Sequence, residues 1–295
     1  MAPNTTYWRS PELGEQKELE LRQGRLRYHD KGTGPPLVFV HGVLVNANLW
    51  RKVVARLSPD FRCIVLDMPI GAHEVPMPRE ADLSPPALGD VIADAIEALG
   101  LDDVTLVGND TGGALSQIAV ARHPQKIGRL VLTNCDAFEN FPPKMLKPVL
   151  RVMTFPAAMP VLLAPTRLAA VRRRALKMMR AAKHPVEQEV VDSYALPPVV
   201  SAGVRRDVKK FFRTADNRYT LEAAERLGSF DRPALIAWAP EDNFFPESDA
   251  RRLAQALPNA RLEWIEDSYI FSPEDQPGKL AELIGSFMRE PAAAS

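Results

Sequence analysis

The stretch VTLVGNDTGGALSQ, residues 104–117, decides the fold of this chain. Its apolar start, rich in β-branched residues, predicts a strand, and residues 114–121 have the spacing of a helix. Between the two lie Asn109, Asp110 and Thr111, with a glycine on either side. A strand that turns this sharply into a helix strains the backbone at its tip and lifts the tip side chain clear of the sheet. The pattern therefore predicts that Asp110 projects from the end of a buried strand.

An aspartate at such a tip can act as a nucleophile. The N-terminus of the following helix supplies free N–H groups and a positive dipole end, which help to keep a carboxylate ionised. An ionised carboxylate needs no base to attack a saturated carbon and form an alkyl ester, the chemistry that opens epoxides or displaces halide. The simpler interpretation is an aspartate that caps a helix without any catalysis. The residues of the turn alone leave both interpretations open.

Two further motifs accompany the turn. The segment VFVHG, residues 38–42, is an apolar strand that ends in His-Gly, where the second oxyanion donor arises in proteins with this kind of turn. That donor is predicted to be the N–H of Val43, paired with the N–H of Thr111. Downstream, IAWAPEDNFFP, residues 236–246, has an apolar strand followed by a Glu-Asp pair. This motif places Asp242 just beyond the end of another strand.

The order of the predicted elements gives the fold class. Residues 17–30 alternate as in an N-terminal hairpin, and short apolar strands then alternate with helices, which predicts an α/β chain with a mostly parallel sheet. That order stops over residues 138–227, where prolines are frequent and the spacing is helical. Helices are predicted there over residues 166–182, 186–194 and 198–213. The chain is therefore predicted to be an α/β core with an all-helical insertion.

With these motifs the chain resembles the α/β-hydrolase-fold superfamily, and within it the aspartate-nucleophile branch that includes haloalkane dehalogenases and epoxide hydrolases. The resemblance implies a mostly parallel eight-stranded sheet flanked by helices, formed by residues 1–137 and 228–295. It implies a helical cap domain over residues 138–227. It also implies that Asp110 is the nucleophile and that Asp242 is the acid of a catalytic triad.

The third member of that triad is missing. The family carries a histidine after the last strand, followed by Phe and a Glu-Asp-x-Pro helix start. In IEDSYIFSPEDQP, residues 265–277, Phe271 matches, but Ile270 stands where the histidine is expected, and no histidine follows His184. The histidine activates the water that cleaves the alkyl ester, and such assistance is typically worth about 10²–10⁴-fold. We therefore expect an ester on Asp110 to persist unless another base takes over.

Five residues are predicted as possible pocket residues. Ile270 and Phe271 follow from the alignment near the C-terminus. His41 belongs to the His-Gly turn, where its ring is expected to support the oxyanion loop. His73 follows the carboxyl end of a strand, the edge at which open α/β sheets bind ligands. Tyr194 is the candidate for the cap tyrosine with which epoxide hydrolases protonate the opening oxygen, although packing is the simpler role for it.

Composition limits the class of partner. Basic and acidic residues balance at 37 each, which gives no overall signal for nucleic acid. Cys63 and Cys135 lie in apolar runs, which is typical of buried thiols and not of a disulfide framework or a zinc site. No apolar run is long enough to span a bilayer and the N-terminus has no signal-peptide pattern, so a cytoplasmic location is expected. We expect a small-molecule substrate, no cofactor, no metal and no stable membrane insertion, and the oligomeric state stays open.

The charge is unevenly distributed along the chain. From Lys144 to Lys183 there are ten basic residues and no acidic one, and the next acid is Glu187. The favoured interpretation is a solvated face of the insertion. The alternative is attraction of an anionic substrate, of a carrier-bound substrate or of an acidic membrane surface.

The predicted function is hydrolysis of an epoxide or a carbon–halogen bond in a small to medium apolar substrate. Haloalkane dehalogenases usually place a tryptophan directly after the nucleophile, and Thr111 stands there instead, so the usual halide site is not expected. Two alternatives stay open. A non-hydrolytic cyclase, lyase or isomerase would use Asp110 as a general acid or base. A binding protein would keep the pocket without catalysis.

Overall fold

The computed structural model describes residues 7–155 and 157–290. One sheet of eight strands forms the centre of this described chain. The strands are β1 (Glu15–Leu21), β2 (Gly24–Lys31), β3 (Pro36–Val40), β4 (Arg62–Leu66), β5 (Val104–Asp110), β6 (Ile127–Cys135), β7 (Ala234–Trp238) and β8 (Ala260–Trp264). Both ends of the predicted core, residues 1–6 and 291–295, and Pro156 of the predicted insertion lie outside the described residues.

The strands follow the order β1-β2-β4-β3-β5-β6-β7-β8 across the sheet. β1 and β2 form the predicted hairpin, and β2 runs antiparallel to β4. All other neighbouring strands are parallel. The prediction of a mostly parallel eight-stranded sheet flanked by helices is therefore confirmed. Because parallel strands end at one edge, the loops that follow β3, β5, β6 and β7 lie together at that edge.

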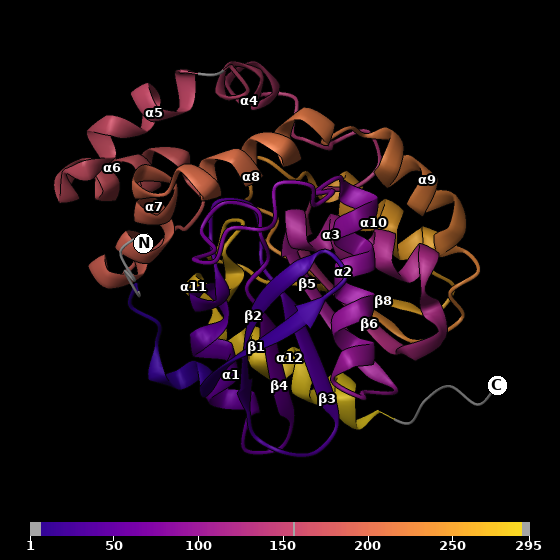
Figure 1. Ribbon diagram of the computed structural model, residues 1–295. Coiled ribbons are helices and arrows are strands. Elements are labelled where there is room, and N and C mark those ends of the chain that lie inside the picture. The colour runs from indigo at the N-terminus through magenta and orange to yellow at the C-terminus, as the bar shows by residue number, and fades with distance from the viewer. Residues whose placement is uncertain (1–6, 156, 291–295) are drawn as a thin grey trace.

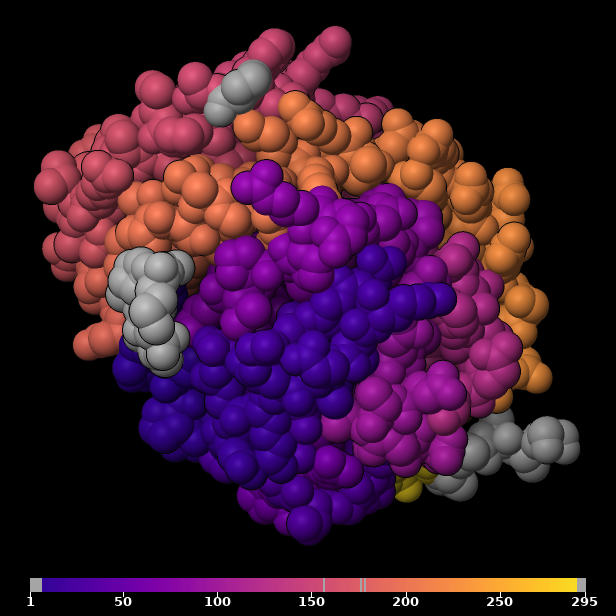
Figure 2. Space-filling model, in the orientation of Figure 1, coloured from indigo at the N-terminus to yellow at the C-terminus, as the bar shows by residue number. Residues whose placement is uncertain are grey.

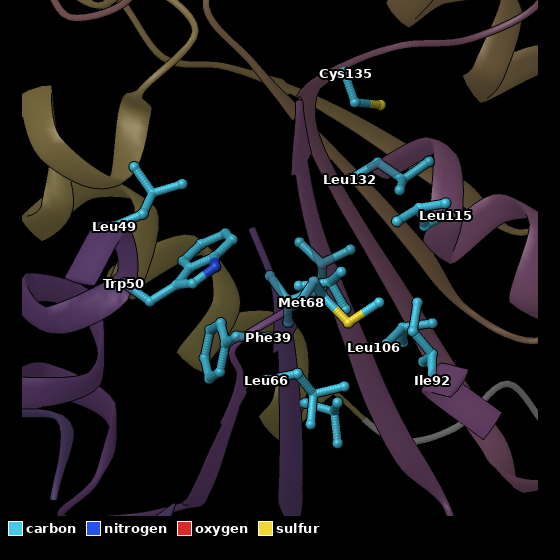
Figure 3. Packing of buried hydrophobic residues seen from close by; sticks show 14 of the residues in the cluster. Phe39, Leu49, Trp50, Leu66, Met68, Ile92, Leu106, Leu115, Leu132 and Cys135 are labelled. Atoms are coloured by element: carbon cyan, nitrogen blue, oxygen red, sulfur yellow. The ribbon is translucent and has the colours of Figure 1, made fainter. Parts of the chain in front are cut away.

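Helices outside the insertion cover both faces of the sheet (Figure 1). They are α1 (Arg51–Leu57), α2 (Pro85–Ala98), α3 (Thr111–Arg122), α10 (Glu247–Ala256), α11 (Ser272–Asp275) and α12 (Pro277–Arg289), with 3-10 turns η1 (Pro11–Leu13), η2 (Ala47–Trp50) and η3 (Pro124–Lys126). Phe39 and Trp50, whose ring centroids lie 5.1 Å apart, pack on one side of the strands, and Ile92 and Leu115 pack on the other (Figure 3). This burial on both faces explains the short, wholly apolar strands in the sequence.

Between β6 and β7 the described chain is helical. It contains α4 (Lys147–Met153), α5 (Ala158–Leu163), η4 (Ala164–Arg167), α6 (Ala169–Met179), α7 (Gln188–Val200), α8 (Ala202–Thr214) and α9 (Arg218–Leu227). The sequence predicts only three of these helices: α4, α5 and α9 are additional, and α7 continues through Pro197 and Pro198. In Figure 1, α4, α5 and α6 lie on the outer side of α7 and α8, and Figure 2 shows the insertion as a layer over one side of the core.

Candidate active site

The turn between β5 and α3 holds Asp110 in a strained conformation. Its φ of 53° and ψ of −132° lie in a region that residues other than glycine rarely adopt. The glycines around it are required by the close packing of the turn. A Cβ on Gly112 would lie 2.3 Å from the carbonyl oxygen of Val40, and a Cβ on Gly108 would lie 2.6 Å from the Cα of Gly113. The structure thus confirms that Asp110 stands at the tip of a sharp strand-to-helix turn.

The Asp110 carboxylate is held by the two predicted oxyanion donors. The backbone N–H of Val43 donates to its Oδ2 at 3.1 Å, and the N–H of Thr111 also donates to the carboxylate. Gly42 permits this close approach, because a Cβ there would lie 2.0 Å from Oδ2. Since donors at these positions favour negative charge, the turn and the loop after β3 together bind an anionic side chain.

A cavity of about 310 Å³ lies beside Asp110. Apart from Asp110, Thr111 and Asp136, every side chain that lines it is apolar. These apolar residues are Val43, Leu44, Phe141, Pro142, Pro143, Leu146, Val149, Leu150, Met153, Met179, Ala181, Phe211, Phe212, Ala215, Phe244, Phe245, Ile270 and Phe271. The lining comes from both the core and the insertion, and its composition suits an uncharged, largely apolar ligand.

Asp136 is a residue of this cavity that the sequence analysis missed. It follows β6, and only 1% of it is exposed. The hydroxyl of Thr111 donates to its Oδ2 at 3.0 Å, whereas its Oδ1 has no hydrogen-bond partner among the described residues. Its position directly after an apolar strand at the ligand-binding edge of the sheet is the signal that could have revealed it.

The two carboxyl groups in the cavity wall affect one another. Burial raises the pKa of Asp110 to about 7, although the N–H groups of Thr111 and Val43 oppose this rise. Burial also raises the pKa of Asp136 well above its usual range, and the charge of Asp110 adds to this effect. Two buried carboxyls that interact in this way do not both ionise near neutral pH. The charge belongs to Asp110, which has two backbone donors, so Asp136 is the neutral partner.

The contact with Thr111 occupies only one oxygen of Asp136. Oδ2 is hydrogen-bonded to the Thr111 hydroxyl, and the buried Oδ1 has no partner among the described residues. The cavity wall therefore combines Asp110 with a second carboxyl group that has one oxygen without a partner.

Asp242, the predicted triad acid, lies near Asp110 but does not line the cavity. The side-chain amide of Asn134 donates to its Oδ2 at 2.8 Å, and the N–H of Phe244 donates to its Oδ1 at 2.8 Å. Burial raises the pKa of Asp242 to about 6. Its charge raises the pKa of Asp110, which shows that the two groups interact. No histidine of the described chain is hydrogen-bonded to Asp242.

Ile270 and Phe271 line the cavity, as the sequence analysis allowed. The backbone carbonyl of Ile270 accepts a hydrogen bond of 2.8 Å from the side chain of Asn109, the residue just before Asp110. The segment that contains Ile270 is thus hydrogen-bonded directly to the strand-to-helix turn.

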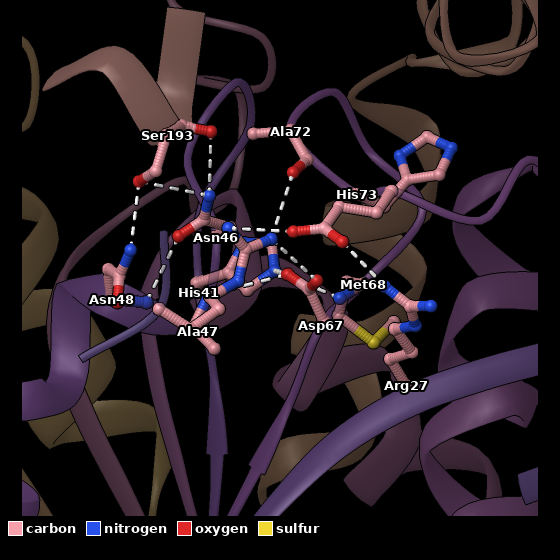
Figure 4. Close-up of polar contacts among 12 residues, drawn as sticks. Arg27, His41, Asn46, Ala47, Asn48, Asp67, Met68, Ala72, His73 and Ser193 are labelled. Carbon is pink, nitrogen blue, oxygen red and sulfur yellow. Dashed lines mark hydrogen bonds and ion pairs between the residues drawn. The ribbon is translucent and has the colours of Figure 1, made fainter. Parts of the chain in front are cut away.

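His41 lies in a buried polar network and not in the cavity lining (Figure 4). Its Nδ1 is hydrogen-bonded to the carbonyl of Gly42 at 2.8 Å, and its Nε2 accepts from the N–H of Met68 at 2.9 Å. With both ring nitrogens engaged, His41 supports the loop that carries Val43 and is not available as a base. In the same network Asn46 and Asn48 donate to Ser193 of α7, each at 2.9 Å.

His73 and Tyr194 are also absent from the cavity lining, which corrects their prediction as pocket residues. His73 Nε2 lies 3.3 Å from a carboxylate oxygen of Asp207 on α8, and the hydroxyl of Tyr194 lies 3.5 Å from Glu274. Both side chains are buried against these partners. The physical reason is that buried polar groups are satisfied within the fold, and these partners are distant in sequence.

The raised pKa of Asp110 predicts a pH-dependent cost to stability. Its folded-state pKa, about 7, exceeds the usual 3.8, so the folded state binds the proton more tightly and loses stability as pH rises through this window. The substitution Asp110→Asn removes this pH-dependent loss of stability, because an asparagine side chain does not titrate. Relative to the original protein, the variant should have a higher free energy of unfolding. We expect this increase to be about 2 kcal/mol larger at about pH 8 than at about pH 5. Denaturant titrations at both pH values measure this difference, with the exposed Asp102→Asn as a control that should show none.

Comparison with known proteins agrees with this architecture. The sequence profile of the family described as alpha/beta hydrolase fold matches residues 35–277. Haloalkane dehalogenase 2 of Mycobacterium bovis is 28% identical over 280 residues, 92% of this chain and 93% of that protein. 2-Hydroxymuconate semialdehyde hydrolase of a Pseudomonas species is 26% identical over 295 residues, 97% of each chain.

Solved structures show the same fold at lower identity. Epoxide hydrolase CorEH superimposes with a TM-score of 0.78 at 19% identity, covering 93% of this chain and 98% of that one. An alpha/beta hydrolase fold protein from Burkholderia ambifaria superimposes with a TM-score of 0.77 at 21% identity, covering 92% and 97%. Because the family profile spans most of the sequence, this chain belongs to the alpha/beta hydrolase fold family.

Proposed function

We propose that the protein is a hydrolase-fold enzyme in which Asp110 attacks a carbon of an epoxide carried by a small to medium apolar molecule. The observation that carries this proposal is the pair of carboxyls in one apolar cavity. Asp110 accepts from two backbone N–H groups, which favour its ionised form against the burial that raises its pKa to about 7, and Asp136 has an oxygen without a hydrogen-bond partner. Relatives named as haloalkane dehalogenase and epoxide hydrolase support a reaction at a saturated carbon.

In the proposed step a carboxylate oxygen of Asp110 forms a bond to one ring carbon of the epoxide. The bond between that carbon and the ring oxygen breaks, and the oxygen takes the proton from Asp136 Oδ1. The products are a hydroxyalkyl ester on Asp110 and a carboxylate on Asp136. One negative charge is present in the cavity before and after the step, so the reaction never requires two buried charges.

The lining of the cavity favours an epoxide over a carbon–halogen bond. A departing halide needs N–H donors, and no tryptophan, asparagine or glutamine side chain lines the described cavity. An epoxide oxygen needs a proton, which Asp136 supplies. Carbon–halogen cleavage by the same nucleophile is the second candidate, and the dehalogenase among the relatives is the reason to compare both substrates.

We further propose that breakdown of the ester is slow. Ile270 occupies the place proposed for the catalytic histidine, and the described lining contains no histidine, lysine, tyrosine or glutamate, so the carboxylate that the first step leaves on Asp136 is the one side chain there that could activate water. Residues 138–227 act as the cap domain over the cavity in this proposal. The lack of a histidine in the described lining also favours one alternative from the sequence. In that alternative the protein is a cyclase, lyase or isomerase, and Asp110 and Asp136 exchange protons with the substrate without forming a covalent ester.

Asp136→Asn tests the proposed division of roles. An asparagine keeps the size of the side chain but supplies no acidic proton, so we expect addition of a terminal epoxide to Asp110 to slow by about 10²-fold. Addition of a primary haloalkane, whose leaving group takes no proton, should change by less than about threefold. The rates are read as the increase in intact-protein mass over time.

The outcomes distinguish the candidate functions. Equal slowing with both substrates would remove Asp136 from the role of proton donor. Product formation without any mass increase would replace nucleophilic attack by acid–base chemistry. Binding of both substrates without adduct or product would identify a binding protein.

A further inference from the structure

The outer helices of the insertion expose an unusual amount of apolar side chain. Of the ten large apolar residues that are exposed in the described chain, eight lie between Met145 and Met179, on or beside α4, α5 and α6. We call these eight the outer apolar face. Met145, Phe155, Val161 and Leu168 are each at least 60% exposed. Isolated exposed apolar residues are ordinary, but such a concentration marks a surface that associates with something.

Helix α4 shows the feature most clearly, because it is apolar on two sides. Leu150 and Met153 line the cavity beside Asp110. On the same helix Val152, which does not line the cavity, is 46% exposed, and Val149, which also lines the cavity, is 45% exposed. A surface helix that only covers a core keeps polar residues on its outer side. The outer residues of α4 are therefore not explained by packing within this chain.

The charges around this face have a single sign. Of the ten basic residues from Lys144 to Lys183, eight are exposed and form no ion pair with any described residue. The two exceptions are Arg172, paired with Asp192, and Lys183, paired with Glu241 and Asp267. Elsewhere, surface arginines commonly pair with a neighbouring carboxylate. The region thus combines exposed apolar side chains with uncompensated positive charge.

We propose that the outer apolar face, with the basic residues around it, binds the protein to an anionic lipid surface. Cations are attracted to acidic headgroups, while apolar side chains enter the boundary between headgroups and acyl chains. The geometry suits helices that lie along such a surface. No single helix in the described ranges has the length and apolarity to cross a membrane, and α4 with α5–η4 reach that composition only as a pair bent by 110°.

The same face adjoins the cavity. Val149 and Met179 belong to the outer apolar face and also line the cavity beside Asp110. A lipid surface in contact with this face would lie next to the opening of an apolar pocket. An apolar substrate dissolved in the bilayer would then reach Asp110 without crossing water, a consequence that rests on the proposed function, whereas the lipid binding itself does not.

Co-sedimentation with lipid vesicles tests the proposal. We expect the full-length protein to bind phosphatidylcholine vesicles that contain phosphatidylglycerol, and to bind pure phosphatidylcholine much less. Each exposed cation near such a surface is worth about fivefold in binding, so Arg173→Gln, Arg174→Gln and Lys177→Gln together should weaken it by about a hundredfold. Phe155→Ser should weaken it by about tenfold through loss of apolar insertion.

The matched control removes three exposed cations from elsewhere on the surface. Arg22→Gln, Lys279→Gln and Arg289→Gln together change the net charge equally and should leave vesicle binding within about threefold of the original. An equal loss in this control, or no binding of the original protein to anionic vesicles, would overturn the proposal. So would a dimer in lipid-free solution that Phe155→Ser dissociates, since a second copy would then cover the face. The assay requires no turnover, so its result is independent of the reaction at Asp110.

Discussion

Asp110→Asn will abolish the covalent adduct that the original protein forms with a reactive epoxide. The original protein should gain the full mass of the epoxide, because ring opening by the carboxylate expels no atom. An amide oxygen is a far weaker nucleophile than a carboxylate, and loss of a nucleophile commonly costs at least about 10³-fold in rate. Intact-protein mass spectrometry after matched incubations measures the result, and peptide mapping locates the added mass.

The control for this prediction is Asp249→Asn. Asp249 is also a buried carboxyl near the site, but it does not line the cavity; it is hydrogen-bonded to Asn140, and its charge is the smallest of the contributions that raise the pKa of Asp136. That variant should form the adduct at nearly the original rate. An adduct that survives in Asp110→Asn, or that maps to another residue, would refute the assignment of the nucleophile and leave only the fold.

Ile270→His is expected to accelerate breakdown of the ester by about 10²–10⁴-fold. Ile270 lines the same cavity as Asp110, so a ring at this position would face the ester. Asp242 must orient that ring. Its oxygens accept from the side chain of Asn134 and from the backbone N–H groups of residues 243–245, so a ring at position 270 must share or displace one of these donors. Loss of the added mass after excess epoxide is removed gives the rate.

Ile270→Phe separates the chemistry from the shape of the side chain. Phenylalanine introduces a ring of similar size without a basic nitrogen, and its ester should persist as in the original protein. If Ile270→His folds normally but releases the ester no faster, position 270 is not the place of the family's histidine. The proposal that Asp242 is poised to orient a ring would then be withdrawn as well.

The fold could be predicted from the sequence because its signals are local. Apolar runs such as residues 37–40 and 63–66 are short and continuous, and a sheet covered on both faces requires that pattern. The turn at Asp110 could be predicted for a similar reason. Glycines at 108 and 112 have no local alternative when a Cβ would collide with neighbouring backbone.

Parts of the insertion could not be predicted in this way. Its prolines suggest interruption, yet in α4 Pro148 occupies the first turn, where the missing N–H costs nothing. In α7 the pair Pro197 and Pro198 lies near the C-terminal end, and packing holds the helix through it. Here tertiary contacts decide the helix boundaries.

The polar side chains of the site depend even more on distant partners. Asp136 is held in the cavity wall by a hydrogen bond with Thr111. His73 is hydrogen-bonded to Asp207, a residue 134 positions away, and therefore does not line the pocket. The sequence places such residues at the correct edge of the sheet. It does not say which of them will be bound to another part of the chain.

Buried hydrogen bonds join the loop after β3 to α7, whereas α4, α5 and α6 lie on the outer side of α7 and α8. The helices of the insertion therefore form two groups, an inner pair bonded to the core and an outer group. Asn46 and Asn48 join that loop to Ser193, and His73 joins the core to α8. Displacing α7 or α8 would break these bonds and would also shift the segment that carries Val43. We therefore expect these two helices to act as a fixed wall that keeps the nucleophile aligned. Substrate entry and product exit would then depend on movement of α4, α5 and α6.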